Sequence, residues 1–95
     1  MGEIVYRRKL SAEEVNEGFL FITKEGLKRL PAVSETFKIR ISDREFEVKI
    51  DAGQKIHLKE ITEFPGLKKG AEIAFVKEAG EEGKYWLYAL TKQLP

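Results

Sequence analysis

The sequence contains no cysteine and only one histidine, one methionine and one tryptophan. Without cysteine, disulfides, thiolate metal sites and cysteine nucleophiles are excluded, and the chain suits a reducing compartment. The single histidine, His57, cannot form a histidine-rich metal site, although carboxylates can complete a mixed one. We therefore expect neither a metal nor another cofactor.

Long apolar runs are also lacking. No stretch reaches the roughly 18 residues that cross a bilayer, and the first residues become charged before any signal-like segment. We therefore expect a cytoplasmic protein with no membrane partner. Charged residues make up 35% of the chain, nearly all of them lysine, glutamate or arginine, which is the bias of thermophile surfaces. The net charge is only +1, so affinity for nucleic acid depends on where the charges lie.

Catalytic signatures are missing as well. There is no G-x-S-x-G elbow, no G-x-x-x-x-G-K-[ST] phosphate loop and no H-E-x-x-H zinc motif. The segment GEEGK at 80–84 resembles a phosphate loop only superficially, because Tyr85 follows it and no helix does. Glu45 and Glu47 share one predicted strand face, where alternation makes them part of an exposed ladder. We therefore expect a binding module and no enzyme.

The apolar pattern predicts one small, mostly β domain over residues 1–95, a length that suits a single core. Two short helices are expected, one after the S-x-x-E capping box of Ser11 and Glu14 and one from Lys24 to Leu30. Short strands leave exposed edges unless the sheet closes, so a barrel or half-open barrel is favoured. Strands are expected at 4–9, 19–22, 37–42, 46–50, 55–59, 71–77 and 84–91.

Basic residues are unevenly placed along the chain. They gather at 7–9, at 24–29 and around His57, whereas the turn at 78–83 is acidic. One end of the domain is therefore expected to be basic. Such local groups, and not the total charge, neutralise the phosphates of DNA.

Three segments resemble the B3-type DNA-binding domains. The first, LSAEEVNEGFLFITK at 10–24, matches that family's leucine, polar turn and valine before an apolar strand, with Thr23-Lys24 in place of Pro-Lys. The second, DAGQKIHL at 51–58, is similar to a polar turn leading into an apolar strand. The third, GLKKGAEI at 66–73, is similar to the family's Leu-Lys-x-Gly-Asp-x-Val turn. The match follows the family's order over most of the chain.

The resemblance implies a seven-stranded open pseudobarrel with two short helices, which is shared with the DNA-recognition domains of some bacterial restriction endonucleases. Such a domain grips the major groove of double-stranded DNA with two arms, here 7–24 and 54–59, and a nuclease or regulatory partner chain is possible. The sequence differs from the plant domains by lacking tryptophan-rich middle strands and by having Glu17-Gly18 where they have a basic-polar pair. The DNA-binding residues implied in this way are Arg7, Lys9, Asn16, Lys24, Gln54, Lys55, His57 and Lys59.

These residues have distinct expected roles. Lysines suit phosphates, whereas the amides of Asn16 and Gln54 are able to pair bidentately with adenine. Two other functions stay open. A protein-interaction adaptor is favoured if the apolar loop 64–67 forms a contact patch. An OB-like binder of single-stranded nucleic acid needs aromatic side chains outward on one sheet face, for which the candidates are Tyr6, Tyr85, Trp86 and Tyr88.

Overall fold

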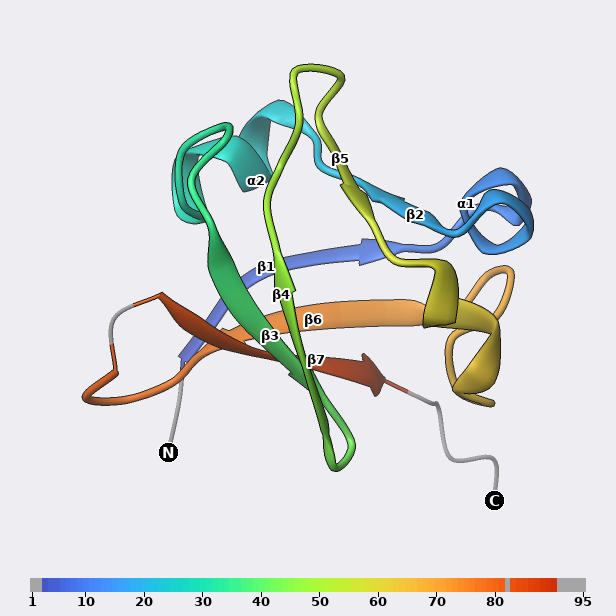
Figure 1. Ribbon diagram of the computed structural model, residues 1–95. Helices are drawn as coiled ribbons and strands as arrows, with labels where there is room; N and C mark the ends of the chain where they lie inside the picture. Colours follow the sequence, from blue (N-terminus) through green and yellow to red (C-terminus); the bar gives the residue numbers. More distant parts are fainter. Residues whose placement is uncertain (1–2, 82, 91–95) are drawn as a thin grey trace.

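The computed structural model describes residues 3–81 and 83–90, which form a mostly β fold (Figure 1). The expected seven strands and two short helices are confirmed. A 3-10 helix, η1, was not expected. The strands are β1 (Glu3–Lys9), β2 (Phe19–Phe21), β3 (Phe37–Ile41), β4 (Arg44–Val48), β5 (Lys55–His57), β6 (Glu72–Lys77) and β7 (Lys84–Leu90), and the helices are α1 (Ala12–Glu17), α2 (Lys24–Arg29) and η1 (Lys59–Glu63).

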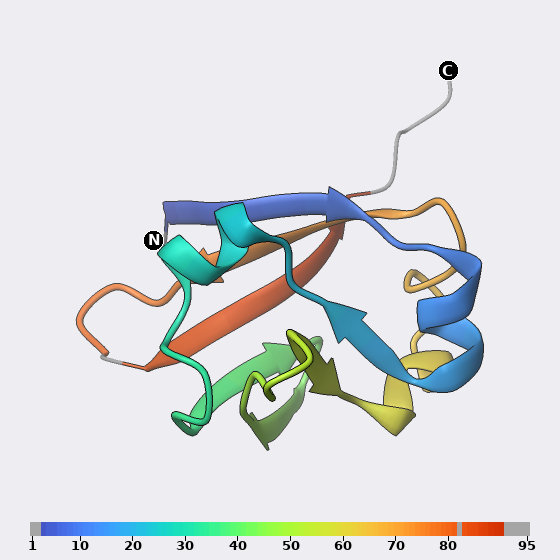
Figure 2. The ribbon, with the colours of Figure 1, turned by 90° about the horizontal axis from the view of Figure 1, so that it is seen from above.

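The strands form two sheets. Five strands are ordered β1-β6-β7-β3-β4, with antiparallel neighbours except for the parallel pair β3 and β7. Strands β2 and β5 form an antiparallel pair, which we name the β2–β5 ribbon. Figure 2 shows β1, β6 and β7 on one side of the molecule, with the ribbon facing them from the other.

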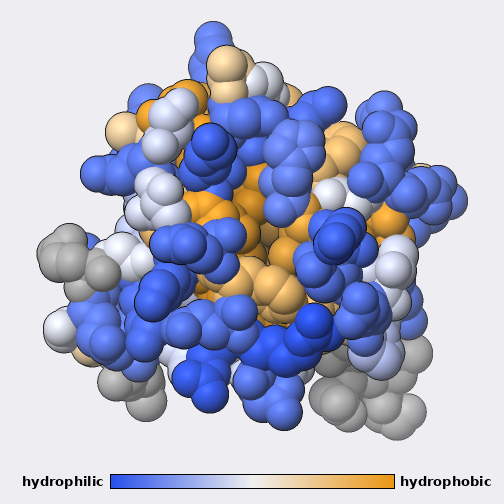
Figure 3. Space-filling view, in the orientation of Figure 1, coloured by the Kyte–Doolittle hydropathy of each residue, from blue (hydrophilic) through white to orange (hydrophobic). Residues whose placement is uncertain are grey.

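Hydrogen bonds at two places connect the two sheets. At the first place, an isolated antiparallel bridge pairs Ile50 with Ile56, and the N–H of Asp51 donates to the carbonyl of Lys55 at 2.9 Å. At the other, the hydroxyl of Tyr6 in β1 accepts from the N–H of Thr23 at 3.0 Å. Beyond the Ile50–Ile56 bridge β4 and β5 diverge, and Figure 3 shows a hollow of apolar surface in the middle of this face, bordered by hydrophilic side chains.

Local signals explain where the helices begin and end. The predicted capping box is confirmed, because Ser11 Oγ accepts from the N–H of Glu14 and Glu14 Oε1 accepts from the N–H of Ser11. Gly18 ends α1 at φ 78°, and an added Cβ would meet the Cα of Lys59 at 3.0 Å. Thr23 is the N-cap of α2 as expected, but its hydroxyl makes no cap bond and lies 2.8 Å from Tyr6 Oη.

Several predicted strand limits differ from the structure by one or two residues, and the expected end of the last strand at residue 91 lies outside the described residues. The strand expected at 55–59 ends at His57, because the next N–H, of Leu58, donates to the Gly18 carbonyl and η1 then begins at Lys59. Strand β4 begins at Arg44, since the turn from β3 occupies only two residues.

The core lies between the sheets and follows the expected alternation. Its side chains include those of Ile39, Ile56, Ile73 and Phe75, which are fully buried. The loop at 64–67 anchors in the core through its first and last residues, as predicted. None of the helices in residues 3–81 and 83–90 is long and apolar enough to cross a membrane.

Candidate nucleic-acid interface

The β2–β5 ribbon brings together two segments that are far apart in the sequence. Phe19 pairs with His57, Leu20 with Ile56, and Phe21 with Lys55. The ribbon therefore joins one segment from each of the two DNA-binding arms implied by the B3 resemblance. Their proximity rests on backbone pairing and not on surface side chains.

The ribbon has a buried side and an exposed side. Leu20 and Ile56 point inward and are fully buried. Directly opposed residues in an antiparallel pair share a face, so the other two pairs point away from the core. On this outer side the ammonium of Lys55 lies 4.5 Å from the centre of the Phe19 ring, which is buried, whereas Phe21 is 36% exposed. The outer side thus combines cationic and aromatic groups.

Glu14 fixes the position of the ribbon against α1 and β1. Its side chain is almost fully buried, forms an ion pair with Arg8, and accepts from the N–H groups of Phe21 at 2.6 Å and Ser11 at 2.9 Å. Burial opposes the charged form, but the bonds from Arg8 and the two backbone N–H groups outweigh it, so the pKa of Glu14 is lowered. The carboxylate therefore stays ionised at neutral pH and anchors the edge of β2.

Arg8 and Phe21 were not among the predicted site residues. Both line a cleft of about 350 Å³ beside the ribbon, together with Ser11, Glu13, Glu14, Phe19 and Lys55. The signal in the sequence for Arg8 was its alternation with Tyr6, which places both on the inner side of β1. Arg8 was assigned to the general basic cluster and not to the site.

Gln54 connects the turn before β5 to the residue that follows β2. Its backbone carbonyl accepts from the N–H of Ile22 at 2.7 Å, and its Nε2–H donates to the Ile22 carbonyl at 2.8 Å. Its φ of 63° lies in the left-handed region, so the turn depends on a strained residue. The bidentate adenine pairing expected of Gln54 requires the bond to Ile22 to break first.

His57 is held by a carboxylate of the preceding turn. Its Nε2 lies 2.7 Å from Asp51 Oδ2, while Asp51 Oδ1 accepts from the N–H groups of Gly53 and Lys55. These bonds, first that from the Lys55 N–H and then that from His57, lower the pKa of Asp51. The imidazole is thereby oriented at the exposed surface of the ribbon.

The other predicted residues divide into two groups. Lys24 lies beyond the end of β2 and Lys59 beyond the end of β5, so exposed lysines flank opposite ends of the ribbon, and Asn16 is exposed on α1. Arg7 and Lys9 are elsewhere, because their register with β6 places them on the outer face of the five-stranded sheet. Arg7 is also paired with a glutamate of β6 at 2.8 Å.

The lysines at the ends of the ribbon differ from most of the arginines in their partners. Within the described part of the chain, the lysines that flank the ribbon, Lys24 and Lys59, have no carboxylate at ion-pair distance. Arg7, Arg8, Arg29 and Arg44 all have one. The available positive charge near the ribbon therefore belongs to lysines, which suit phosphates as point charges.

Comparisons with protein-family models, curated proteins and solved structures found no match. In residues 3–81 and 83–90, no group of three or more histidine or carboxylate side chains is arranged to hold a metal ion.

Proposed function

We propose that this protein is a non-catalytic module that binds double-stranded DNA by laying the β2–β5 ribbon in the major groove. The observation that carries the proposal is the pairing of 19–21 with 55–57, which joins the two implied arms in one element. The major groove of B-DNA is wide enough for a two-stranded β-ribbon. The outer side of the ribbon carries polar groups for such contacts, among them the exposed His57.

The positions of the lysines support the same orientation of the ribbon on DNA. Lys24 and Lys59 flank the ends of the ribbon without carboxylate partners, and Lys55 lies on its outer side. Lysines at such positions contact phosphates and set the register of the protein on the duplex. Asn16 and His57, both exposed, supply groups for the edges of bases.

The pseudobarrel is part of this proposal. The Ile50–Ile56 bridge and the bond between Tyr6 and Thr23 connect the ribbon to both edges of the five-stranded sheet, as an open barrel requires. A B3-like module of this kind acts as a free-standing regulator or as the specificity domain of a nuclease on another chain. Both roles need only duplex binding from this chain.

The test begins with selection from a random duplex pool, followed by affinity measurements at several salt concentrations. The double variant Lys24→Ala/Lys59→Ala removes the two flanking charges. Lys38→Ala/Lys77→Ala is the matched control, because it removes the same charge from exposed positions on the five-stranded sheet. We expect the first variant to bind duplex more weakly and to reduce the salt slope by about 2, and the control to change neither.

Two outcomes overturn the proposal. One is no duplex binding at concentrations up to roughly 100 μM at physiological salt, where non-specific binding is already measurable. The other is an equal loss of affinity in both double variants, since that places the duplex away from the ribbon.

A further inference from the structure

The outer face of the five-stranded sheet carries a stacked aromatic pair. Trp86 and Tyr88 alternate in β7 with Tyr85 and Leu87, which are buried. The rings of Trp86 and Tyr88 are nearly parallel, with an interplanar angle of 6° and centroids 5.7 Å apart. Tyr88 is 45% exposed, so one side of this stack is open to solvent. An exposed stack of this kind is a surface on which another planar group is able to pack.

An arginine with an unsatisfied group lies beside the stack. The guanidinium carbon of Arg40 is 5.0 Å from the centre of the Trp86 ring, and Arg40 pairs with Trp86 across β3 and β7. Its Nε is buried and has no hydrogen-bond partner in the described residues, nor does Arg40 have a carboxylate there at ion-pair distance. The other arginines all have such a carboxylate. Buried donors are rarely left unpaired, so this environment is unusual for an arginine. The Nε itself is closed to solvent, but Arg40 as a whole is only partly buried and its side chain makes no hydrogen bond or ion pair in the described residues, so the rest of its guanidinium is free to bind an anionic ligand.

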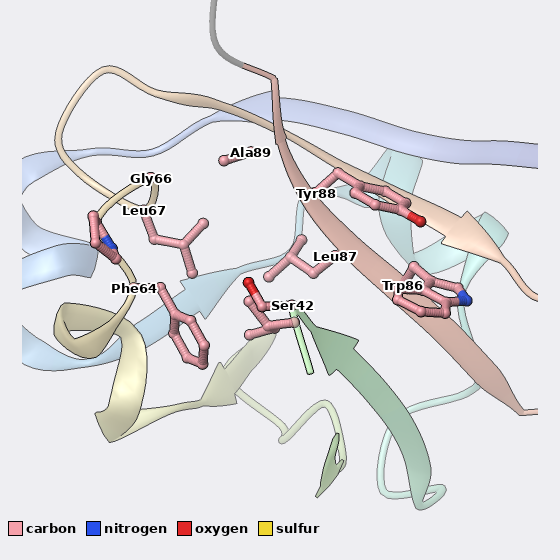
Figure 4. Close-up of a pocket in the computed structure, with 10 residues that line it drawn as sticks. Ser42, Phe64, Gly66, Leu67, Trp86, Leu87, Tyr88 and Ala89 are labelled. Atoms are coloured by element: carbon pink, nitrogen blue, oxygen red, sulfur yellow. The ribbon is translucent and has the colours of Figure 1, made fainter. Parts of the chain in front are cut away.

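The stack forms one wall of a groove of about 400 Å³ (Figure 4). Phe64 and Leu67 lie on the opposite side, and Leu87 and Ser42 lie between the two walls. The groove exists because the parallel pairing of β3 with β7 ends at Trp86, whereas β7 continues to Leu90. The groove is therefore built from aromatic and apolar side chains, with Arg40 next to it.

We propose that this groove binds an unpaired nucleobase stacked against Tyr88, with the attached phosphate at Arg40. An aromatic platform beside a cation is the combination with which proteins bind single-stranded nucleic acid. A peptide rich in proline would also pack on aromatic rings, but it brings no negative charge for Arg40. The unpartnered guanidinium therefore favours the nucleotide.

This site is separate from the β2–β5 ribbon. The stack lies on the outer face of the sheet, and the ribbon covers the core from the other side (Figure 2). The inference goes beyond the proposed duplex binding and does not depend on it.

Trp86 is the sole tryptophan of the chain, so its fluorescence reports on this site alone. The experiment titrates the protein with hexathymidylate, with thymidine monophosphate and with a hexamer of abasic sites that has the same phosphates. We expect saturable quenching with the hexathymidylate and no comparable signal with the abasic hexamer. Thymidine monophosphate distinguishes a free nucleotide from a single strand as the source of the base. If the monophosphate binds with the same affinity per base as the hexathymidylate, the site belongs to a free nucleotide.

Variants then test which side chains bind the base and its phosphate. Tyr88→Ala is expected to weaken binding about tenfold or more, whereas Tyr88→Phe retains the ring and the affinity. Arg40→Gln is expected to weaken binding and to flatten its salt dependence. Val33→Ala is the control, because it removes a comparably exposed apolar side chain that belongs neither to the groove nor to the ribbon. Thermal unfolding of each variant shows whether it folds.

Three results overturn this inference: equal quenching by the abasic hexamer, unchanged affinity in folded Tyr88→Ala, and quenching by a proline-rich peptide but by no nucleotide. The two proposals fail separately. Absence of duplex binding by the unaltered protein overturns only the ribbon proposal, and absence of base-dependent quenching overturns only the groove proposal. Lys24→Ala/Lys59→Ala should keep normal quenching, and Tyr88→Ala should keep duplex binding.

Discussion

The β2–β5 ribbon and the five-stranded sheet are stabilised in different ways. The strands of the sheet are five to seven residues long and bury side chains such as Ile39 and Phe75 completely. The ribbon strands have three residues each, and a two-stranded sheet of this size is not stable by itself. The ribbon therefore needs contacts from other elements.

Polar bonds from neighbouring elements supply much of this support. The carboxylate of Glu14 holds the N–H of Phe21, the Gly18 carbonyl holds the end of β5, and the Tyr6 hydroxyl holds the N–H of Thr23. The first bond comes from α1, the second from the C-cap residue of the same helix, and the third from β1. Removing one of them should loosen the ribbon more than the sheet, and this contrast is directly measurable.

The largest effect is expected from Glu14→Ala. This change leaves Arg8 without its partner and the N–H groups of Ser11 and Phe21 without their acceptor, so the free energy of unfolding should fall by about 3 kcal/mol. Urea unfolding measures the loss, and hydrogen exchange should show the Phe21 amide opening before amides of β6. Glu13→Ala, an exposed change one residue away, should alter stability by no more than about 0.5 kcal/mol. Equal losses in both variants would contradict the anchoring role.

Gly26→Ala should have the next largest effect. Gly26 is buried in α2, and an added Cβ would lie 2.7 Å from both Ile22 Cγ2 and Tyr6 Cζ. The clash costs about 1–3 kcal/mol, and the better helix propensity of alanine offsets only part of it. Thermal unfolding should show a lower melting temperature, whereas the exposed change Lys28→Ala in the same helix should leave it nearly unchanged. A Gly26→Ala protein as stable as the original would show that the Tyr6 ring moves freely.

Tyr6→Phe should cost less, about 1 kcal/mol, because it removes only a hydroxyl. The ring contact with Phe75 remains, but the N–H and hydroxyl of Thr23 lose their partner. Hydrogen exchange at Thr23 and the ribbon should accelerate with little change in β6. Tyr88→Phe is the control, since its hydroxyl lies on an exposed side chain. Faster exchange throughout the sheet would mean that the two regions are not independent.

Much of the sheet was predictable because its signals are local. Alternation at 37–50 places Ile39 and Val48 inward, and the capping box of Ser11 and Glu14 fixes the start of α1. Anchoring of the loop 64–67 also followed from its apolar residues. Such features depend on residues that are close together in the sequence, so the local sequence pattern is enough to predict them.

The features that connect the ribbon were not predictable in the same way. Pairing of β2 with β5 joins segments separated by over thirty residues, and nothing local identifies the partner. The sequence interpretation put Arg8 in a basic cluster and Gln54 among the DNA-binding residues, whereas in the structure Arg8 forms an ion pair with Glu14 and Gln54 donates to the backbone carbonyl of Ile22. Alternation alone also left open whether Trp86 or Tyr85 faces solvent, because these two adjacent residues of β7 are both aromatic. That choice is made by the packing of Tyr85 into the core.

Acid should weaken the turn that carries Asp51, with the smallest effect on the whole fold. Folding lowers the pKa of Asp51, so its stabilisation is complete above the ordinary aspartate value of about 3.9 and is lost as the pH falls through the lower folded value. An NMR titration should therefore move the amide signals of Gly53 and Lys55 with a midpoint below about 3.9. Asp51→Asn keeps an oxygen that accepts from both N–H groups but does not titrate, so this movement should disappear. A midpoint at or above the ordinary value would show that the bonds from Lys55 and His57 do not favour the carboxylate, and the orientation of His57 on the ribbon would lose its support.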